Sequence, residues 1–284
     1  METITSAQNP KIKNLLLLQE KSRARREQGL FVVEGRRELE HCLEAGFKVR
    51  TLFVCPEIFG SIADEGTVGP AAEGRGRGRS EAEAISDTIP SSAEAVIEIP
   101  EALYRKVAYR ESTEGIIAEV EYKEQGLQDL NLPDNPLIMV LESVEKPGTL
   151  GAVLRSADAA GAHAVLICDP LTDLYNPNLI RASIGAVFTV PTVACSSEDA
   201  ITFLQGRGIQ ILTAQLQDSS LYYDIDMRRG TALVMGTEST GLTDQWRKAA
   251  SAHIRIPMLG RLDSLNVSVS AAILLFEAVR QRQI

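Results

Sequence analysis

The stretch LIMVLESVEKPGTLGAVLRSADAAGAHAVLIC, residues 137–168, decides the fold class of this 284-residue chain. It begins with an apolar strand, Leu137–Leu141, continues into an alanine-rich helix, Leu150–Ala160, and ends in a second apolar strand, Ala164–Cys168. Gly161 closes the helix, because glycine adopts the left-handed backbone of a helix end without strain. This order predicts two neighbouring parallel strands with a helix across one face.

The same alternation continues to the carboxyl end of the chain. Strands are predicted at Ile209–Ala214, Ala232–Met235 and Ile254–Ile256, and helices at Asn178–Ala186, Ser197–Gln205 and Val267–Arg280. We therefore expect an α/β domain over residues 136–284, with a parallel sheet covered by helices on both faces. Because ligands bind at the carboxyl ends of such strands, the polar and glycine-rich clusters that follow strands are candidate sites.

The first part of the chain predicts a smaller α/β domain over residues 1–122, with a linker over residues 123–135. A helix is expected at Lys11–Glu27, and residues 60–92 are rich in Gly, Ala, Ser and Glu. That composition predicts a flexible insertion. Its GRGRGR tract, residues 74–79, is either plain linker or a contact for RNA.

Charge and cysteine content narrow the function classes. The net charge of −9 argues against nucleic-acid binding by bulk charge, but the basic run Lys21–Arg26 offers a local face. Arg23, Arg25 and Arg26 are thus candidate RNA-binding residues, the alternative being a solvated helix face. The four cysteines form no CxxC pair, so we expect reduced thiols and no metal site. With no signal pattern or apolar span in the sequence, we expect a cytoplasmic protein.

Three clusters follow predicted strands. The first, residues 142–155, has a glycine-containing turn and then Arg155, which either holds a phosphate or is a surface residue. The second, GTESTGLT at residues 236–243, is close to the phosphate-binding loop GxxxxGK[ST], but Leu242 replaces the lysine. This excludes an NTPase and leaves either an ordinary connection or a loop with one carboxylate, Glu238.

The third cluster is IPMLGRLDSLNVS, residues 256–268, in which Ser264 or Asn266 begins a helix. The free N–H groups of that helix start could also hold a carboxylate. Gly206-Arg207-Gly208 precedes a strand instead of following one, so a GxGxxG dinucleotide site is excluded.

Taken together and in this order, the three clusters resemble the SpoU/TrmH family of SPOUT RNA methyltransferases over residues 137–280. Residues 176–186 also look like the family, and residues 1–122 are similar to its L30e-like RNA-binding domain. The resemblance implies a trefoil knot in the second domain and a homodimer with active sites at the interface. It also implies transfer of a methyl group from S-adenosylmethionine to a ribose 2′-hydroxyl of ribosomal or transfer RNA, of which ribosomal RNA is the preferred expectation.

Site residues follow from the same resemblance. It assigns the cofactor to backbone at Gly236, Ile256 and Leu265, and catalytic function to four side chains: Arg155, Glu238, Ser264 and Asn266.

One departure from the family is Thr149, where the family usually has Asn. Thr lacks the paired donor and acceptor of the amide. The alternative function is therefore an RNA-binding or assembly protein of the same fold with weakened catalysis.

Overall fold

The structure is a computed structural model, and it describes residues 2–65, 92–109, 114–237 and 239–283. The chain forms two compact units, Met1–Lys123 and Glu124–Ile284, which are described separately below. None of the helices in the described ranges has both the length and the apolar character needed to cross a membrane.

The second unit is built on a seven-stranded sheet in which every pairing is parallel. The strand order is β10-β12-β9-β11-β6-β7-β8. In chain order the strands are β6 (Leu137–Glu142), β7 (Ala164–Cys168), β8 (Thr192–Cys195), β9 (Gln210–Ala214), β10 (Ser220–Leu221), β11 (Thr231–Met235) and β12 (Ala252–Arg255). The predicted parallel α/β fold is confirmed. The trefoil knot stays a prediction, because strand order alone does not establish threading.

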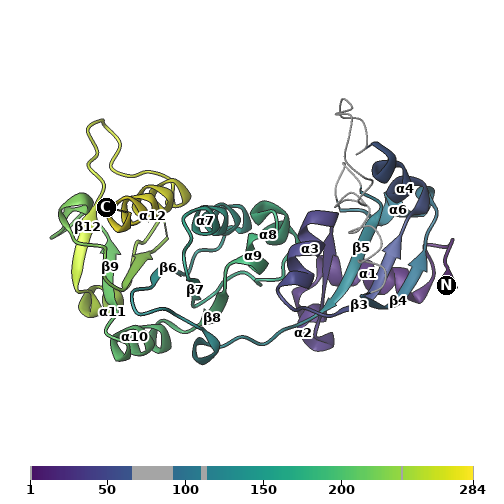
Figure 1. The fold of residues 1–284 in the computed structure, drawn as a ribbon, viewed down its shortest axis with the longest axis horizontal. Coiled ribbons are helices and arrows are strands. Elements are labelled where there is room, and N and C mark those ends of the chain that lie inside the picture. Colours follow the sequence, from purple (N-terminus) through teal and green to yellow (C-terminus); the bar gives the residue numbers. More distant parts are fainter. Residues whose placement is uncertain (1, 66–91, 110–113, 238, 284) are drawn as a thin grey trace, which may run out of the picture. The chain divides into compact units, whose positions relative to one another are not determined.

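Helices cover both faces of this sheet (Figure 1). They are α7 (Pro147–Ala159), α8 (Pro177–Ser183), α9 (Ala186–Thr189), α10 (Ser197–Gly206), α11 (Asp244–Ala249) and α12 (Val267–Arg282), with 3₁₀ turns at Leu127–Asp129 and Tyr222–Asp224. Figure 1 shows α7 and α12 on one face and α10 and α11 on the other. Side chains of alternate strand residues, such as Ile138 and Val140, pack with Leu204 of α10 and Trp246 of α11. This alternation explains why the strands are apolar throughout.

One predicted helix of this unit is broken in the structure. The helix expected over residues 178–186 is two short helices, because Ile184 and Gly185 both have left-handed backbone, with φ of 53° and 81°. The helix α10 begins at Ser197, as expected, and Ser196 is its N-cap, whose side chain accepts a hydrogen bond from the Asp199 N–H. The Ser197 hydroxyl takes part in a buried hydrogen-bond network.

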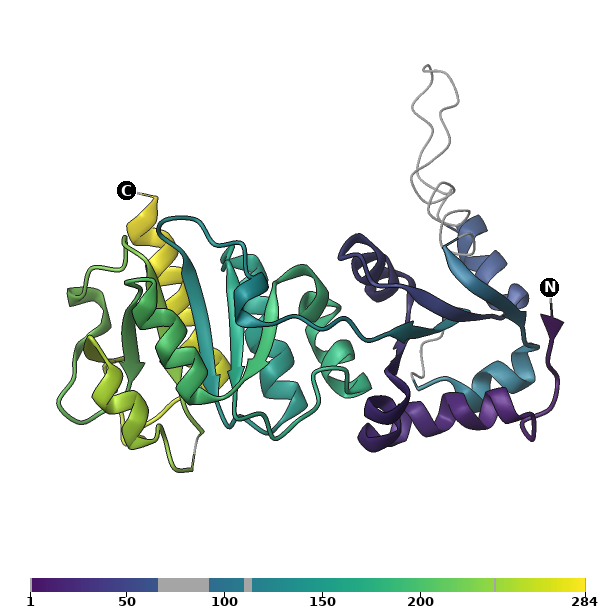
Figure 2. The ribbon, with the colours of Figure 1, turned by 90° about the horizontal axis from the view of Figure 1, so that it is seen from below.

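The first unit has a mixed five-stranded sheet in the order β1-β4-β3-β5-β2. The strands are β1 (Glu2–Thr3), β2 (Leu30–Glu34), β3 (Val49–Val54), β4 (Ala93–Glu98) and β5 (Ile116–Glu121). The helices are α1 (Pro10–Glu20), α2 (Ser22–Gln28), α3 (Arg36–Glu44), α4 (Pro56–Glu65) and α6 (Glu101–Val107). Figure 2 shows α1 along one face of this sheet, where Ile12, Leu15 and Leu18 are fully buried.

The structure corrects two predictions in this unit. The single helix expected at Lys11–Glu27 is broken at Lys21, which has extended backbone between α1 and α2. The helix α4 runs to Glu65, so the first residues of the insertion expected at 60–92 are helical. Residues 66–91 of that expected insertion lie outside the described part of the chain.

Candidate active site

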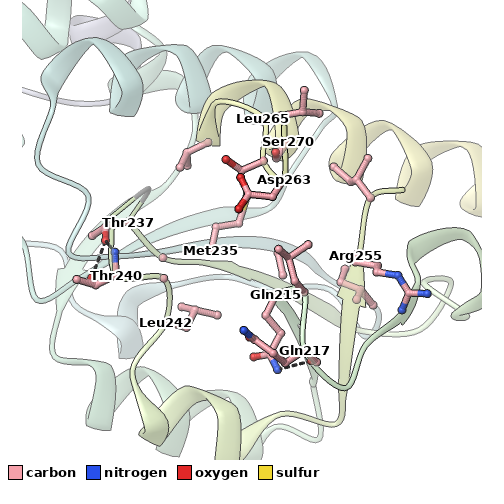
Figure 3. A pocket seen from close by; sticks show the side chains of 18 of the residues that line it. Gln215, Gln217, Met235, Thr237, Thr240, Leu242, Arg255, Asp263, Leu265 and Ser270 are labelled. Carbon is pink, nitrogen blue, oxygen red and sulfur yellow. Dashed lines mark hydrogen bonds between the residues drawn. The ribbon is translucent and has the colours of Figure 1, made fainter. Parts of the chain in front are cut away.

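A cavity of about 430 Å³ lies at the carboxyl ends of β9, β11 and β12 and beside the start of α12. Figure 3 shows Thr237 and Thr240 on one side of it, Arg255 on the opposite side, and Met235 between them. Apolar side chains form much of its wall: Met235, Leu242, Ile254, Leu265 and Leu274. Its position is where a parallel α/β sheet places its ligand site.

The loop after β11, residues 236–243, of which all but residue 238 are described, supplies one wall of the cavity and folds back so that Thr237 meets Gly241. Thr237 and Gly241 form an isolated antiparallel bridge. The Thr237 hydroxyl accepts a hydrogen bond from the Thr240 N–H at 3.0 Å and lies 2.8 Å from the Thr240 hydroxyl. Gly236 lines the cavity at the start of the loop. Glu238, the predicted catalytic carboxylate, lies outside the described residues.

The segment after β12 forms a second wall. The structure brings Ile256, Ser264 and Leu265 together with Gly236 around the cavity, as part of its lining. Asn266 does not belong to the lining of this cavity. It is the N-cap of α12, and its Oδ1 accepts hydrogen bonds from the Ser268 N–H at 2.9 Å and the Ser268 hydroxyl at 2.6 Å. Of the two caps that the sequence allowed, Asn266 begins the helix.

The first sequence cluster borders a second cavity, of about 380 Å³. Its lining includes Lys146 and Thr149, and it shares Thr237, Ser239, Thr240 and Val267 with the larger cavity. The two cavities are therefore neighbours on either side of the loop after β11.

Arg155 is separate from both cavities. It is exposed on α7, and among the described residues no side chain or carbonyl is bonded to its guanidinium. The structure thus does not bring Arg155 to the cofactor-sized cavity of its own chain.

Part of the cavity lining was not predicted from the sequence. Ala214, Gln215, Leu216 and Gln217, at and directly after the end of β9, line the larger cavity, and so does Asp263. The rule that sites form at strand ends would have identified residues 214–217, because β9 is the neighbour of β11. Nothing in the spacing of Asp263 distinguishes it from the other residues of its loop.

The basic run of the first unit divides into two kinds of residue. Arg23 and Arg26 are exposed, and Arg23 forms an ion pair with Glu27 at 2.6 Å. Arg25 is a correction: it is only 2 % exposed, and its Nη1 donates to the Leu18 carbonyl at 2.7 Å and the Gln19 carbonyl at 3.2 Å. These carbonyls belong to the last turn of α1, so Arg25 caps that helix and is not presented to RNA.

The larger cavity suits S-adenosylmethionine in size and chemistry. Small-molecule sites range over roughly 300–1,000 Å³ and combine apolar walls with a few polar groups. Here the apolar side chains can enclose the adenine ring, while the hydroxyls of Thr237 and Thr240 and the carboxylate of Asp263 offer polar contacts. No cluster of three or more His, Cys, Asp or Glu side chains that could hold a metal is found among the described residues.

Comparison with known proteins identifies the family. Residues 136–276 match the SpoU rRNA Methylase family, and residues 9–118 match the MRM3-like substrate binding domain. The 23S rRNA (guanosine-2′-O-)-methyltransferase RlmB of Salmonella typhi is 42 % identical over 176 residues, which cover 60 % of this chain and 72 % of the relative. This chain belongs to the SpoU rRNA methylase family.

Other SpoU relatives extend the match over nearly the whole chain. The 23S rRNA (uridine(2479)-2′-O)-methyltransferase of Streptomyces viridochromogenes is 28 % identical over 89 % of this chain and 84 % of its own length. A crystal structure of an RNA 2′-O ribose methyltransferase matches with a TM-score of 0.77 and 37 % identity, covering 99 % of this chain and 100 % of the other. The AdoMet-bound rRNA methyltransferase of Sinorhizobium meliloti matches with a TM-score of 0.82 and 28 % identity, covering 98 % and 97 %.

The family resemblance drawn from the three clusters is thus confirmed. As a SpoU enzyme the chain is an RNA methyltransferase, and its cofactor is S-adenosylmethionine. The alternative of a binding protein with weakened catalysis finds no support among these relatives.

Proposed function

We propose that this SpoU enzyme methylates a ribose 2′-hydroxyl in ribosomal RNA, specifically in the RNA of the large ribosomal subunit. The observation that carries the proposal is the pair of neighbouring cavities with a common wall of hydroxyl side chains, Thr237, Ser239 and Thr240. One cavity has the size and walls for the cofactor, and the other leaves space for a nucleotide beside it. The names of the relatives supply the position of the methyl group and the class of RNA.

The larger cavity would hold the cofactor through backbone at Gly236, Ile256 and Leu265. Bound S-adenosylmethionine supplies a methyl group that its sulfonium already activates for displacement. The protein therefore has mainly to align the acceptor oxygen with that methyl group, and correct alignment alone lowers a barrier by several kcal/mol, up to about 10. Thr149 and Lys146, on the wall of the smaller cavity, are placed to orient the nucleotide.

Arg155 is proposed to act on the acceptor and not on the cofactor. A guanidinium stays protonated in proteins, so it is a poor base. It can grip the phosphate next to the reacting ribose and stabilise the negative charge that develops on the 2′-oxygen as its proton leaves to solvent. The S–CH₃ bond breaks as the O–CH₃ bond forms, and the neutral thioether S-adenosylhomocysteine would be released. Ser264, which lines the cavity, and Asn266, which begins α12, would contribute polar groups on the other side of the reacting atoms. Glu238 is proposed to orient Arg155 or the ribose.

A homodimer would bring Arg155 into the site. Arg155 lines neither cavity of its own chain, so we infer that a second copy supplies it to an active site at the dimer interface. The helix α12, which packs on α7, also leaves two apolar side chains exposed, Val269 at 47 % and Phe276 at 48 %. A second copy packed on α7 and α12 would cover them.

Subunit mixing tests this arrangement. Arg155→Ala and a cofactor-site variant, Leu265→Asp, should each be nearly inactive alone. If sites are shared, mixed dimers regain up to about a quarter of wild-type activity after exchange, because half of the dimers are mixed and each has one intact site. No recovery in mixtures proved by mass spectrometry to contain heterodimers would refute shared sites.

The first unit is proposed to hold the RNA, which its match to a substrate-binding domain supports. Incubation of the purified chain with radiolabelled S-adenosylmethionine and separate large-subunit, small-subunit and transfer RNAs tests the substrate class. We expect label in the large-subunit RNA. Labelling of transfer RNA alone would contradict the proposal.

A further inference from the structure

Glu142 is a buried carboxylate beside the candidate active site that belongs to the wall of neither cavity. It is the last residue of β6, and it is 2 % exposed. The preceding residue, Leu141, pairs with Met235 of β11, so Glu142 lies level with the start of the loop at residues 236–243.

Both carboxylate oxygens of Glu142 are bonded to Thr243, at the far end of that loop. Oε2 accepts from the Thr243 N–H at 2.8 Å, and Oε1 accepts from the Thr243 hydroxyl at 2.6 Å. Thr243 occupies the N-cap of α11, where a threonine hydroxyl normally accepts from its own helix. It makes no such bond here. Its hydroxyl is committed to a residue 101 positions earlier in the chain.

A second group of hydrogen bonds holds α11, the helix that follows Thr243. The Ser197 hydroxyl donates to Asp169 Oδ2 at 2.6 Å, lies 3.4 Å from Glu142 Oε1, and accepts from the Trp246 indole N–H at 2.9 Å. Trp246 lies on α11 and is fully buried. Thr243 is therefore held between the buried end of β6 and α11, whose Trp246 is fully buried, and the loop that begins at Gly236 directly after β11 is held at its far end by Glu142.

We propose that Glu142 is a positioning residue for methyl transfer, which holds the loop at residues 236–243 in the shape that receives the cofactor. Thr240, Gly241 and Leu242, the residues directly before Thr243, all line the larger cavity. Without the anchor, cofactor binding has to order this loop, and that ordering lowers affinity. The inference rests on the proposed function in one respect, the placement of the cofactor against this loop.

Calorimetric titration of the full chain with S-adenosylmethionine tests the inference, together with the KM for the cofactor during rRNA methylation. Glu142→Gln leaves one Thr243 donor facing an amide N–H₂. Because hydrogen bonds to a charged group are among the stronger ones in proteins, we expect Kd and KM to rise about tenfold or more. We expect kcat to change much less. Thr243→Val should also raise Kd, whereas Thr243→Ser, which keeps both donors, should bind within about twofold of wild type.

A matched control tests whether removal of any buried carboxylate charge alters cofactor binding. Glu119→Gln alters another buried carboxyl, in the other unit, and should leave the cofactor Kd unchanged. Wild-type affinity in folded Glu142→Gln would overturn the inference. If that variant does not fold, equal affinities of Thr243→Val and Thr243→Ser would overturn it instead. If the wild-type chain does not bind S-adenosylmethionine, the proposed function itself is contradicted, and not only the role of Glu142.

Discussion

Gly236 and Gly241 lie against each other in the loop after β11: a Cβ atom added to Gly236 would lie 2.3 Å from both the carbonyl carbon and the carbonyl oxygen of Gly241. No side chain fits that space. This close approach closes the loop on itself and places Gly236 at the cavity wall. The loop's shape therefore depends on the absence of a side chain at residue 236.

The first prediction concerns this close approach. Gly236→Ala should force the loop open and raise the Kd for S-adenosylmethionine at least about tenfold, which corresponds to about 1.4 kcal/mol. Titration calorimetry measures the change. Gly206→Ala is the control, because a Cβ there meets no atom within 4 Å. Unaltered cofactor binding by Gly236→Ala would show that the loop does not shape the site.

Arg155 should serve catalysis and not folding. Arg155→Ala should change the free energy of unfolding by no more than a surface substitution does, less than about 0.5 kcal/mol, and should keep cofactor affinity. Methyl transfer should fall roughly 100-fold or more, because the developing charge on the acceptor loses its partner. Arg155→Lys should rescue little, since an ammonium cannot reproduce the guanidinium fork. Near-normal methylation by folded Arg155→Ala would refute the proposed role.

In the basic run of the first unit, the exposed arginines should affect RNA binding, whereas the buried arginine should affect stability. Arg23→Ala with Arg26→Ala should weaken RNA binding and flatten its salt dependence by about 1 in slope for each phosphate that is no longer neutralised. The melting temperature of this double variant should hardly change. Arg25→Ala should do the reverse and cost about 1–3 kcal/mol of stability, because two carbonyls of α1 lose their buried donor. Equal effects of the exposed pair and Arg25 on RNA affinity would contradict this division.

Glu119 should make the stability of the first unit depend on pH. Burial raises the pKa of Glu119, and hydrogen bonds from the Thr51 and Asn14 side chains offset only part of that effect. The protonated carboxyl therefore suits the fold: its contribution is complete below the ordinary Glu pKa of about 4.3 and is lost as the pH rises through the folded-state pKa. Glu119→Gln should be more stable than wild type at pH 7, and the difference should shrink towards pH 4.

Thermal unfolding at several pH values checks this expectation, with the exposed Glu94→Gln as a control. A stability difference that stays constant between pH 4 and pH 7, or one that reverses in sign, would contradict it.

Much of the second unit follows from local pattern. Apolar runs such as Ala164–Cys168 predict buried parallel strands, and glycine or polar clusters directly after Leu141, Met235 and Ile256 indicate where the site forms. These signals are local, because they depend on strand geometry and on the turn that follows. The clusters at residues 236–243 and 256–268, which supply part of the cavity lining, are found in this way, whereas the family resemblance singles out Gly236, Ser264 and Leu265 within them.

What the sequence does not reveal depends on tertiary contacts. Arg25 lies in a basic run that is typical of an exposed helix face. Its burial is explained only by the carbonyls at the end of α1, to which its guanidinium donates. The link from Glu142 to Thr243 spans 101 residues and has no spacing signature. The break between α8 and α9 is only partly visible in the sequence: Gly185 is a local signal for it, but the left-handed backbone of Ile184 has none.

Methylation of a ribose 2′-hydroxyl in large-subunit ribosomal RNA, as proposed for this SpoU enzyme, can be tested directly. The test is mass spectrometry of nucleosides from that RNA after incubation with the purified chain and S-adenosylmethionine carrying a deuterated methyl group. We predict one labelled 2′-O-methylnucleoside, with the label on the ribose fragment, and its loss with Arg155→Ala. Label on a base, or no label in any RNA while wild-type protein binds the cofactor, would contradict the account.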